Sequence, residues 1–277
     1  MEDALRMVED GACSAWALPA DPTCAGIARR IFRRAAVELA LDPMLVDDGV
    51  TMVSELAANT LHAHRAAPEA GPELWLYLRG TGPQRELVCK VFDSYPGWLR
   101  MPAASQSCPV PVDSICGRGL EVVHEMSAGR WGYHLTRSRL GDWPVRGKAV
   151  WFAVPASGAR TGAMPTGVPG QRLPARGLPG NAREAMRELE AALTARGFEG
   201  LVRADDAAAD MAVMSVASGL TVWCRAGAAW LRSPAGNGQR WRYTDLVEVA
   251  EQAVEAHEVL AEGAEAALLA NATRTGA

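Results

Sequence analysis

A segment rich in proline and glycine, without helix or strand periodicity, divides this sequence into two parts. It covers 155–180 and begins Pro-Ala-Ser-Gly-Ala-Arg-Thr-Gly, a composition that is typical of a linker. Because compact domains usually hold ~100–150 residues, the 277 residues of the chain fit one domain on each side of it. We predict a first domain over 1–155, a linker over 156–180, a second domain over 181–270 and a disordered tail over 271–277.

The composition narrows the class of protein. Hydrophobic residues make up 49% and charged residues 22% of the chain, as in globular proteins, and the net charge of −4 predicts no direct nucleic-acid partner. The acidic N-terminus lacks the apolar run of a signal peptide, and no stretch approaches the ~20 apolar residues of a membrane span. We therefore expect a cytoplasmic protein with no membrane partner. The cysteines lack a CxxC pair and metal-ligand spacing, which predicts reduced thiols rather than a zinc site or disulfides.

The first part of the chain alternates between strand and helix patterns. Strands are predicted over 14–18, 73–79, 86–93, 130–135 and 148–154, with a turn signal at 80–83 that joins the second and third into a hairpin. Helices are predicted to start at Asp21-Pro22, at Asp42-Pro43 and at Gly119. The apolar stripe of the first helix would be Ile27, Ile31, Ala35 and Leu39. This order predicts an α+β fold, a two-layer α/β sandwich with a mostly antiparallel sheet covered by helices on one face.

The pattern of the second part, 181–270, predicts a small α-β-β-β-α domain of unknown role. A helix is expected over 184–196, strands over 211–216, 220–225 and 230–232, and a second helix from a capping box that starts at Asp245. Tryptophan and arginine are common at the centres of protein interfaces, and this part holds several of each: Trp223, Trp230, Trp241, Arg225, Arg232, Arg240 and Arg242. Core tryptophans with solvated arginines are the simpler interpretation.

Two polar side chains on the predicted second helix have the spacing for shared chemistry. Glu55 and Asn59 lie four residues apart in Glu-Leu-Ala-Ala-Asn and therefore on one face of the helix. A carboxylate can take a proton from an attacking hydroxyl, and an amide oxygen can ligate a hard cation such as Mg²⁺. The alternative is an ordinary solvated helix face.

Two further motifs suit a nucleotide. Asp93 ends the apolar strand Val-Phe-Asp, where its carboxylate can accept a hydrogen bond from an exocyclic amine, although such an aspartate can also simply start a turn. The second motif is the Gly-x-Gly of Gly117-Arg118-Gly119, at the start of a predicted helix. Glycines let backbone N–H groups come close to phosphate oxygens, and the positive end of the helix attracts the anion. A plain turn before a helix is the alternative.

The three motifs together resemble the histidine-kinase/Hsp90/gyrase ATPase superfamily, with Ser-Glu-Leu-Ala-Ala-Asn at 54–59, Val-Phe-Asp at 91–93 and Gly-Arg-Gly-Leu at 117–120. The segments Ala-Gly-Arg-Trp-Gly at 128–132 and Gly-Lys-Ala-Val-Trp at 147–151 are similar to those of anti-sigma-factor serine kinases of bacteria. The resemblance covers roughly 14–155. It implies a Bergerat-type ATP-binding fold with a mostly antiparallel mixed sheet.

The resemblance also implies roles for particular residues. Glu55 would be the general base, Asn59 the Mg²⁺ ligand, and Asp93 the acceptor of the adenine amine. The segment 100–116 would be a lid over ATP. The residues expected to contact the nucleotide are Asn59, Asp93, Gly97, Gly117, Arg118, Gly119 and Leu120.

Partners follow from the same resemblance. Kinases of this kind bind a sigma factor and phosphorylate a serine on a small antagonist protein, and they often form dimers. We therefore expect Mg·ATP-dependent serine/threonine phosphorylation of an antagonist protein, with ATP and Mg²⁺ as cofactors and a homodimer as the assembly.

Some positions depart from the family pattern and motivate an alternative. Only Gly97 remains of the glycine-rich turn after Asp93, with Tyr95 inside it. Ala63 stands where a histidine is common, and Lys148-Ala149 stands where a threonine is common. The alternative is a non-catalytic ATP-binding or sequestering partner protein in a sigma-factor or signalling switch. A histidine kinase would need a dimerisation helix with a phosphoacceptor histidine, and we expect none before residue 14.

Overall fold

The computed structural model describes residues 6–7, 12–66, 70–94, 117–157, 163–164, 178–234 and 236–275. Contacts between residues divide the chain into two units, Met1–Leu178 and Pro179–Ala277. The two sheets that dominate these units are antiparallel, and helices pack on each of them. The predicted α+β class is confirmed at this level. Among the described residues, no helix combines the length and apolarity needed to cross a membrane.

The first unit is built on a five-stranded sheet in the order β2-β3-β4-β6-β5. Its strands are β2 (Cys13–Ala17), β3 (Glu73–Arg79), β4 (Glu86–Asp93), β5 (Trp131–Arg137) and β6 (Arg146–Pro155). The predicted hairpin is confirmed: β3 pairs with β4 around the short 3-10 helix η1 (Gly82–Gln84). Every neighbouring pair in this sheet is antiparallel, so the expectation of a mixed sheet is wrong for the described strands. A separate short pair joins β1 (Arg6–Met7) to β7 (Ala163–Met164).

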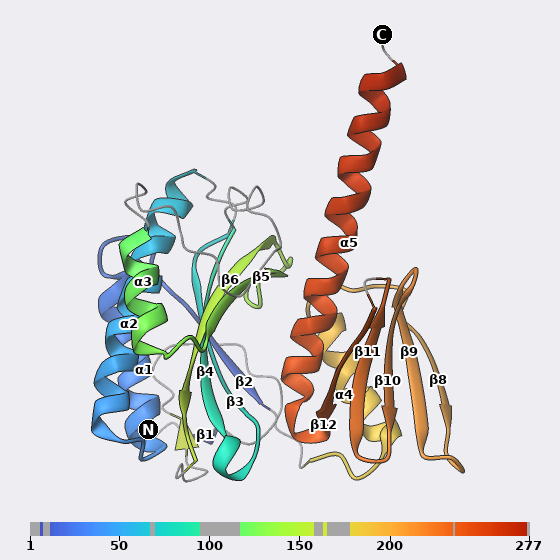
Figure 1. Cartoon of the computed structure of the whole chain (residues 1–277), viewed down its shortest axis with the longest axis horizontal. Helices are drawn as coiled ribbons and strands as arrows, with labels where there is room; N and C mark the ends of the chain where they lie inside the picture. The colour runs from blue at the N-terminus through green and yellow to red at the C-terminus, as the bar shows by residue number, and fades with distance from the viewer. Residues whose placement is uncertain are drawn as a thin grey trace. The chain divides into compact units, whose positions relative to one another are not determined.

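Three helices cover one face of this sheet, as Figure 1 shows: α1 (Cys24–Glu38), α2 (Pro43–Ala66) and α3 (Gly117–Met126). The side chains of the sheet that belong to the core under these helices are Leu74, Leu76 and Leu78 on β3 and Leu87, Cys89 and Val91 on β4. Apolar residues that alternate along a strand lie on the same face. The core of this unit therefore lies between the sheet and the helix layer.

The predicted stripe of α1 is confirmed at Ala35 and Leu39, which are buried, but the buried face is shifted by one position in the first half of the helix. Ala28 and Phe32 are fully buried, whereas Ile27 and Ile31 are only partly buried at the edge of the core. α1 packs against α2 as well as the core, and this packing selects the small Ala28 next to the large Phe32. At Gly49 of α2, an added Cβ would lie 2.2 Å from two ring carbons of Phe32, so only glycine fits at this crossing.

The second unit contains a five-stranded sheet in the order β12-β11-β10-β9-β8, between two helices in sequence. Its elements are α4 (Ala182–Thr194), β8 (Val202–Asp206), β9 (Met211–Ala217), β10 (Leu220–Arg225), β11 (Ala228–Ser233), β12 (Gly236–Arg242), the 3-10 helix η3 (Tyr243–Asp245) and α5 (Leu246–Thr275). The predicted α-β-β-β-α order is therefore wrong, because β8 and β12 were not expected. Both are edge strands whose sequences lack an apolar alternation, so pairing with a neighbour determines them.

The helices of the second unit pack on one face of its sheet. α4 contacts β9 and β10, and α5 contacts β11, with Leu189, Met214, Val222 and Val249 among the buried side chains between them. Arg196, after α4, donates to the Glu251 carboxylate on α5 at 2.5 Å. α5 continues through 271–275, where a disordered tail was predicted. The alanine-rich segment 261–270 precedes these residues, and its helix extends into them.

The described cysteines form no disulfide with one another and lie within the two cores. Cys13, Cys24, Cys89 and Cys224 are all buried. Burial raises the pKa of the Cys24 thiol, raises that of Cys89 further, and raises the pKa of Cys224 to about 12. Cys24, Cys89 and Cys224 are therefore neutral packing groups near pH 7.

Candidate functional site

Glu55 and Asn59 lie on α2 as the sequence predicted, on one side of the helix and half-buried. The neighbouring Leu56 and Ala57 face the core and fix the orientation of this part of α2. The two polar side chains are thus held at the border of the core, where they can contact both the protein and a ligand.

The N-terminal turn of α3 lies directly against this pair. A Cβ added at Gly119 would be 2.8 Å from Oε2 of Glu55 and 3.4 Å from Nδ2 of Asn59. Gly119 therefore brings its backbone close to a carboxylate and an amide on the adjacent helix. The side chain of Leu120 is buried in the core and anchors the turn. Two of the three predicted motifs thus converge in the structure.

Asp93 ends β4 on the helix-covered face of the sheet, in line with Leu87, Cys89 and Val91. Figure 1 shows the end of β4 and the beginning of α3 at the same, upper end of the first unit, and α2 packs on both β4 and α3. The third predicted residue therefore lies at the same end of the unit as the other two motifs.

The Asp93 carboxylate takes part in a buried ion pair that was not predicted from the sequence. Lys148 lies opposite Asp93 in the β4–β6 register, and its Nζ donates to Oδ1 of Asp93 at 2.7 Å. The two side chains are only 5% and 6% exposed. At the neighbouring Gly147, an added Cβ would lie 2.3 Å from the Asp93 carbonyl oxygen, so glycine permits the close approach of β6 to β4. A ligand that uses Asp93 must therefore share its carboxylate with an ammonium group.

The chain's only lysines are Lys90 and Lys148, and both are buried in this sheet. Lys90 belongs to the opposite sheet face, where its Nζ lies 3.0 Å from Nε2 of His134 and over the ring of Tyr77. A lysine within an apolar strand indicates a buried interaction with a polar or charged partner, because a lysine is rarely buried without one. This pattern is visible in the sequence at both positions.

Some of the predicted site lies outside the described residues. This holds for Gly97, for Tyr95 and for the lid 100–116. Gly117 and Arg118 are described as the first turn of α3 but without their side chains, and the same is true of Ala63 in α2. The roles proposed for these residues stay predictions.

No protein-family model and no curated protein matches this chain. The site is therefore interpreted from its own residues. Among the described residues, no group of three His, Cys, Asp or Glu side chains could hold a metal ion. The donors at the α2–α3 contact, one amide and one carboxylate, instead suit a metal that takes its other ligands from phosphates and water.

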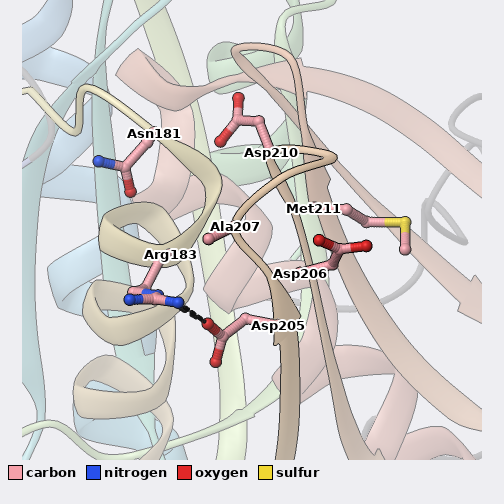
Figure 2. A pocket seen from close by; sticks show the side chains of 7 residues that line it. All are labelled: Asn181, Arg183, Asp205, Asp206, Ala207, Asp210 and Met211. Carbon is pink, nitrogen blue, oxygen red and sulfur yellow. Dashed lines mark hydrogen bonds and ion pairs between the residues drawn. The ribbon is translucent and has the colours of Figure 1, made fainter.

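A second polar site, which sequence reasoning missed, lies in the second unit. A pocket of about 220 Å³ lies between the start of α4 and the β8–β9 turn. Figure 2 shows three aspartates around it. Each aspartate is bound by the chain itself: Asp205 by Arg183 at 2.6 Å, Asp206 by two backbone N–H groups of its own turn, and Asp210 by the Ala182 N–H at 2.8 Å. The aspartates at 205, 206 and 210, just before the predicted strand 211–216, could have indicated this pocket. The Asp205 and Asp210 carboxylates connect α4 to the sheet.

Proposed function

We propose that residues 14–155 form a Bergerat-type nucleotide-binding domain that transfers a phosphoryl group from Mg·ATP to a serine or threonine of a protein partner, in the manner of anti-sigma-factor serine kinases. The observation that carries the proposal is the contact of Gly119 with Glu55 and Asn59. This contact brings together a candidate general base, a candidate cation ligand and the N-terminal turn of a helix. The turn is far from the other two residues in the sequence. Phosphoryl transfer requires these three components close together.

In the proposed reaction, Glu55 takes the proton from the hydroxyl of the partner's serine or threonine. That oxygen bonds to the γ-phosphorus of ATP as the bond between this phosphorus and the β–γ bridging oxygen breaks, giving the phosphorylated partner and ADP. Asn59 would hold Mg²⁺ through its amide oxygen, and the N–H groups of the Gly117–Gly119 turn would bind phosphate oxygens. Bound Mg²⁺ supplies charge neutralisation on the transferred group.

The test is Glu55→Gln, with Glu121→Gln as the matched control on the exposed side of α3. The native protein is co-purified with its partners and incubated with Mg·ATP labelled at the γ-phosphate, and phosphoserine or phosphothreonine on the partner is measured over time. Losing a positioned general base costs ~10²–10⁴-fold in rate, while ATP affinity measured by calorimetry should stay nearly unchanged. Equal labelling by the wild type and Glu55→Gln would reject the proposed base. A sigma factor and its antagonist are the first partners to look for, and sedimentation tests the proposed homodimer.

A second candidate function is favoured by the Asp93–Lys148 ion pair. An aspartate already held by an ammonium group is a weaker acceptor for a base amine, which suits a sequestering partner protein that binds nucleotide weakly and catalyses nothing. Calorimetry with Mg·ATP separates the two functions, because micromolar affinity corresponds to about −8 kcal/mol and gives a clear signal. Absence of heat at millimolar ATP would support the second function. A heat that Asp93→Asn abolishes would support the first.

A further inference from the structure

The second sheet has one face that its helices leave uncovered. Along β10, Leu220, Val222 and Cys224 point into the core of the second unit, so Thr221 and Trp223 belong to the opposite face. Both helices pack on the core side. The opposite face therefore presents its side chains to solvent or to a partner.

Two tryptophans lie at the centre of this face. Trp223 and Trp230 are directly opposed in the β10–β11 register, and their rings are stacked with centroids 6.4 Å apart and planes 7° from parallel. Both are half-buried, and Nε1 of Trp223 donates to Oγ1 of Thr221 at 3.1 Å. The third tryptophan of this region, Trp241, is buried in the core instead. The simpler interpretation from sequence thus holds for Trp241 but not for the stacked pair.

Exposed arginines surround the tryptophan pair: Arg225, Arg232, Arg240 and Arg242. In the strand register, Arg240 is opposite Trp230, and Arg232 is opposite Thr221. Within the described part of the chain, none of these guanidinium groups has a hydrogen-bond or ion-pair partner. We call the four arginines and the two tryptophans the Trp–Arg face.

Acidic groups are scarce on this side of the sheet. Asp206, on the edge strand β8, belongs to the same side because it is opposite Met211. Its Oδ1 already accepts from the N–H groups of Ala208 and Ala209. The Trp–Arg face is therefore locally cationic in a chain whose net charge is −4.

We propose that the Trp–Arg face binds an acidic segment of a protein partner. Its carboxylates would pair with the guanidinium groups, whose planar fork matches a carboxylate. An apolar or aromatic side chain would rest on Trp223 and Trp230, since tryptophan and arginine dominate the energetics of protein interfaces. The proposal concerns the second unit and stands whether or not the first unit binds nucleotide.

Charge selects this occupant over two others. A second copy of the chain using the same face would bring arginines against arginines, and like charges opposed at an interface are repelled. The affinity of nucleic acid depends on many phosphate contacts, and this face offers only four arginines for them. An acidic peptide segment needs only the local positive charge of the face.

The experiment is selection of a random 12-residue peptide library on the immobilised full chain, followed by fluorescence anisotropy with the best peptide. We expect enrichment of peptides with net negative charge. Arg232→Glu should weaken the binding of the best peptide by about tenfold or more. The matched control Arg187→Glu makes the same charge change on the exposed side of α4 and should leave the affinity within about twofold.

Several results would overturn the proposal. These are enrichment of peptides without net negative charge, equal effects of Arg232→Glu and Arg187→Glu, or tighter binding of a single-stranded oligothymidine than of the best peptide. Trp223→Ala supplies a second variant that leaves the charge unchanged, and it should also weaken peptide binding. Unaltered circular dichroism and thermal unfolding of each variant ensure that a lost interaction reflects the surface and not the fold.

Discussion

Replacing Lys148 with methionine should destabilise the first unit strongly. The substitution keeps most of the length of the side chain but leaves the Asp93 carboxylate buried without the ammonium group 2.7 Å away. Breaking a buried ion pair by removing one partner costs about 3–5 kcal/mol, because the remaining charge is not compensated. That is a large part of the ~5–15 kcal/mol that stabilises a typical domain.

The assay is urea unfolding of the full chain followed by circular dichroism, with hydrogen exchange of β4 and β6 amides to localise the effect. The double variant Lys148→Met/Asp93→Leu removes both charges and should recover most of the loss, since a buried pair can be replaced by apolar groups at little cost. Arg33→Met is the matched control: it breaks an ion pair with Asp47 whose side chains are 58% and 77% exposed, and it should cost less than about 1 kcal/mol. A loss at Lys148 no larger than at Arg33, or no recovery in the double variant, would refute the reasoning.

Three further predictions concern packing, capping and ionisation. Gly49→Ala should cost about 1–3 kcal/mol in urea unfolding, because the new methyl group overlaps the Phe32 ring, and Gly49→Ala/Phe32→Leu should recover part of it; an unchanged midpoint would contradict this close approach. Asn181→Ala should cost about 1 kcal/mol in thermal unfolding, because Oδ1 of Asn181 accepts the Glu184 N–H at 2.9 Å at the start of α4, and Asn181→Asp should keep the wild-type stability. Burial raises the pKa of Cys224 from 9.0 to about 12, so the unfolded thiol ionises first and stability should fall as the pH rises from 9 to 12, by up to roughly 4 kcal/mol; a Cys224→Ala variant with the same slope of unfolding free energy against pH would contradict it.

Much of the first unit could be predicted from local patterns. The strands Glu73–Arg79 and Glu86–Asp93 have the predicted bounds, because apolar alternation and a glycine-proline turn specify both the elements and their pairing. The helix starts at 43 and 117 are within two residues of prediction for similar reasons. Local sequence is sufficient where an element is amphipathic and has clear end signals.

Local sequence patterns could not predict the edge strands or the register between β4 and β6. β8 carries two aspartates and all its residues are exposed, so only its pairing with β9 makes it a strand. Asp93 and Lys148 are 55 residues apart, and they meet because β6 inserts between β4 and β5. The sequence could indicate each charged residue separately, but the choice of partner depends on the strand order.

The candidate site, too, could be predicted from the sequence only where it depends on local structure. The i, i+4 relation of Glu55 and Asn59 follows from helix geometry, whereas their contact with Gly119 depends on how α3 packs against α2. The Trp–Arg face likewise required the register, because alternation along β10 and β11 separates Trp223 and Trp230 from the core-facing Trp241.

The placement of both lysines inside the first sheet has a practical consequence for chemical probing. Succinimidyl esters, amine cross-linkers and enzymatic acylation of lysine all require an accessible side-chain amine. Lys90 and Lys148 are both buried in the folded sheet and are therefore not accessible to these reactions. Acylation of either residue would therefore report that the sheet has opened, so mass spectrometry of these two positions offers a built-in reporter of unfolding for the first unit.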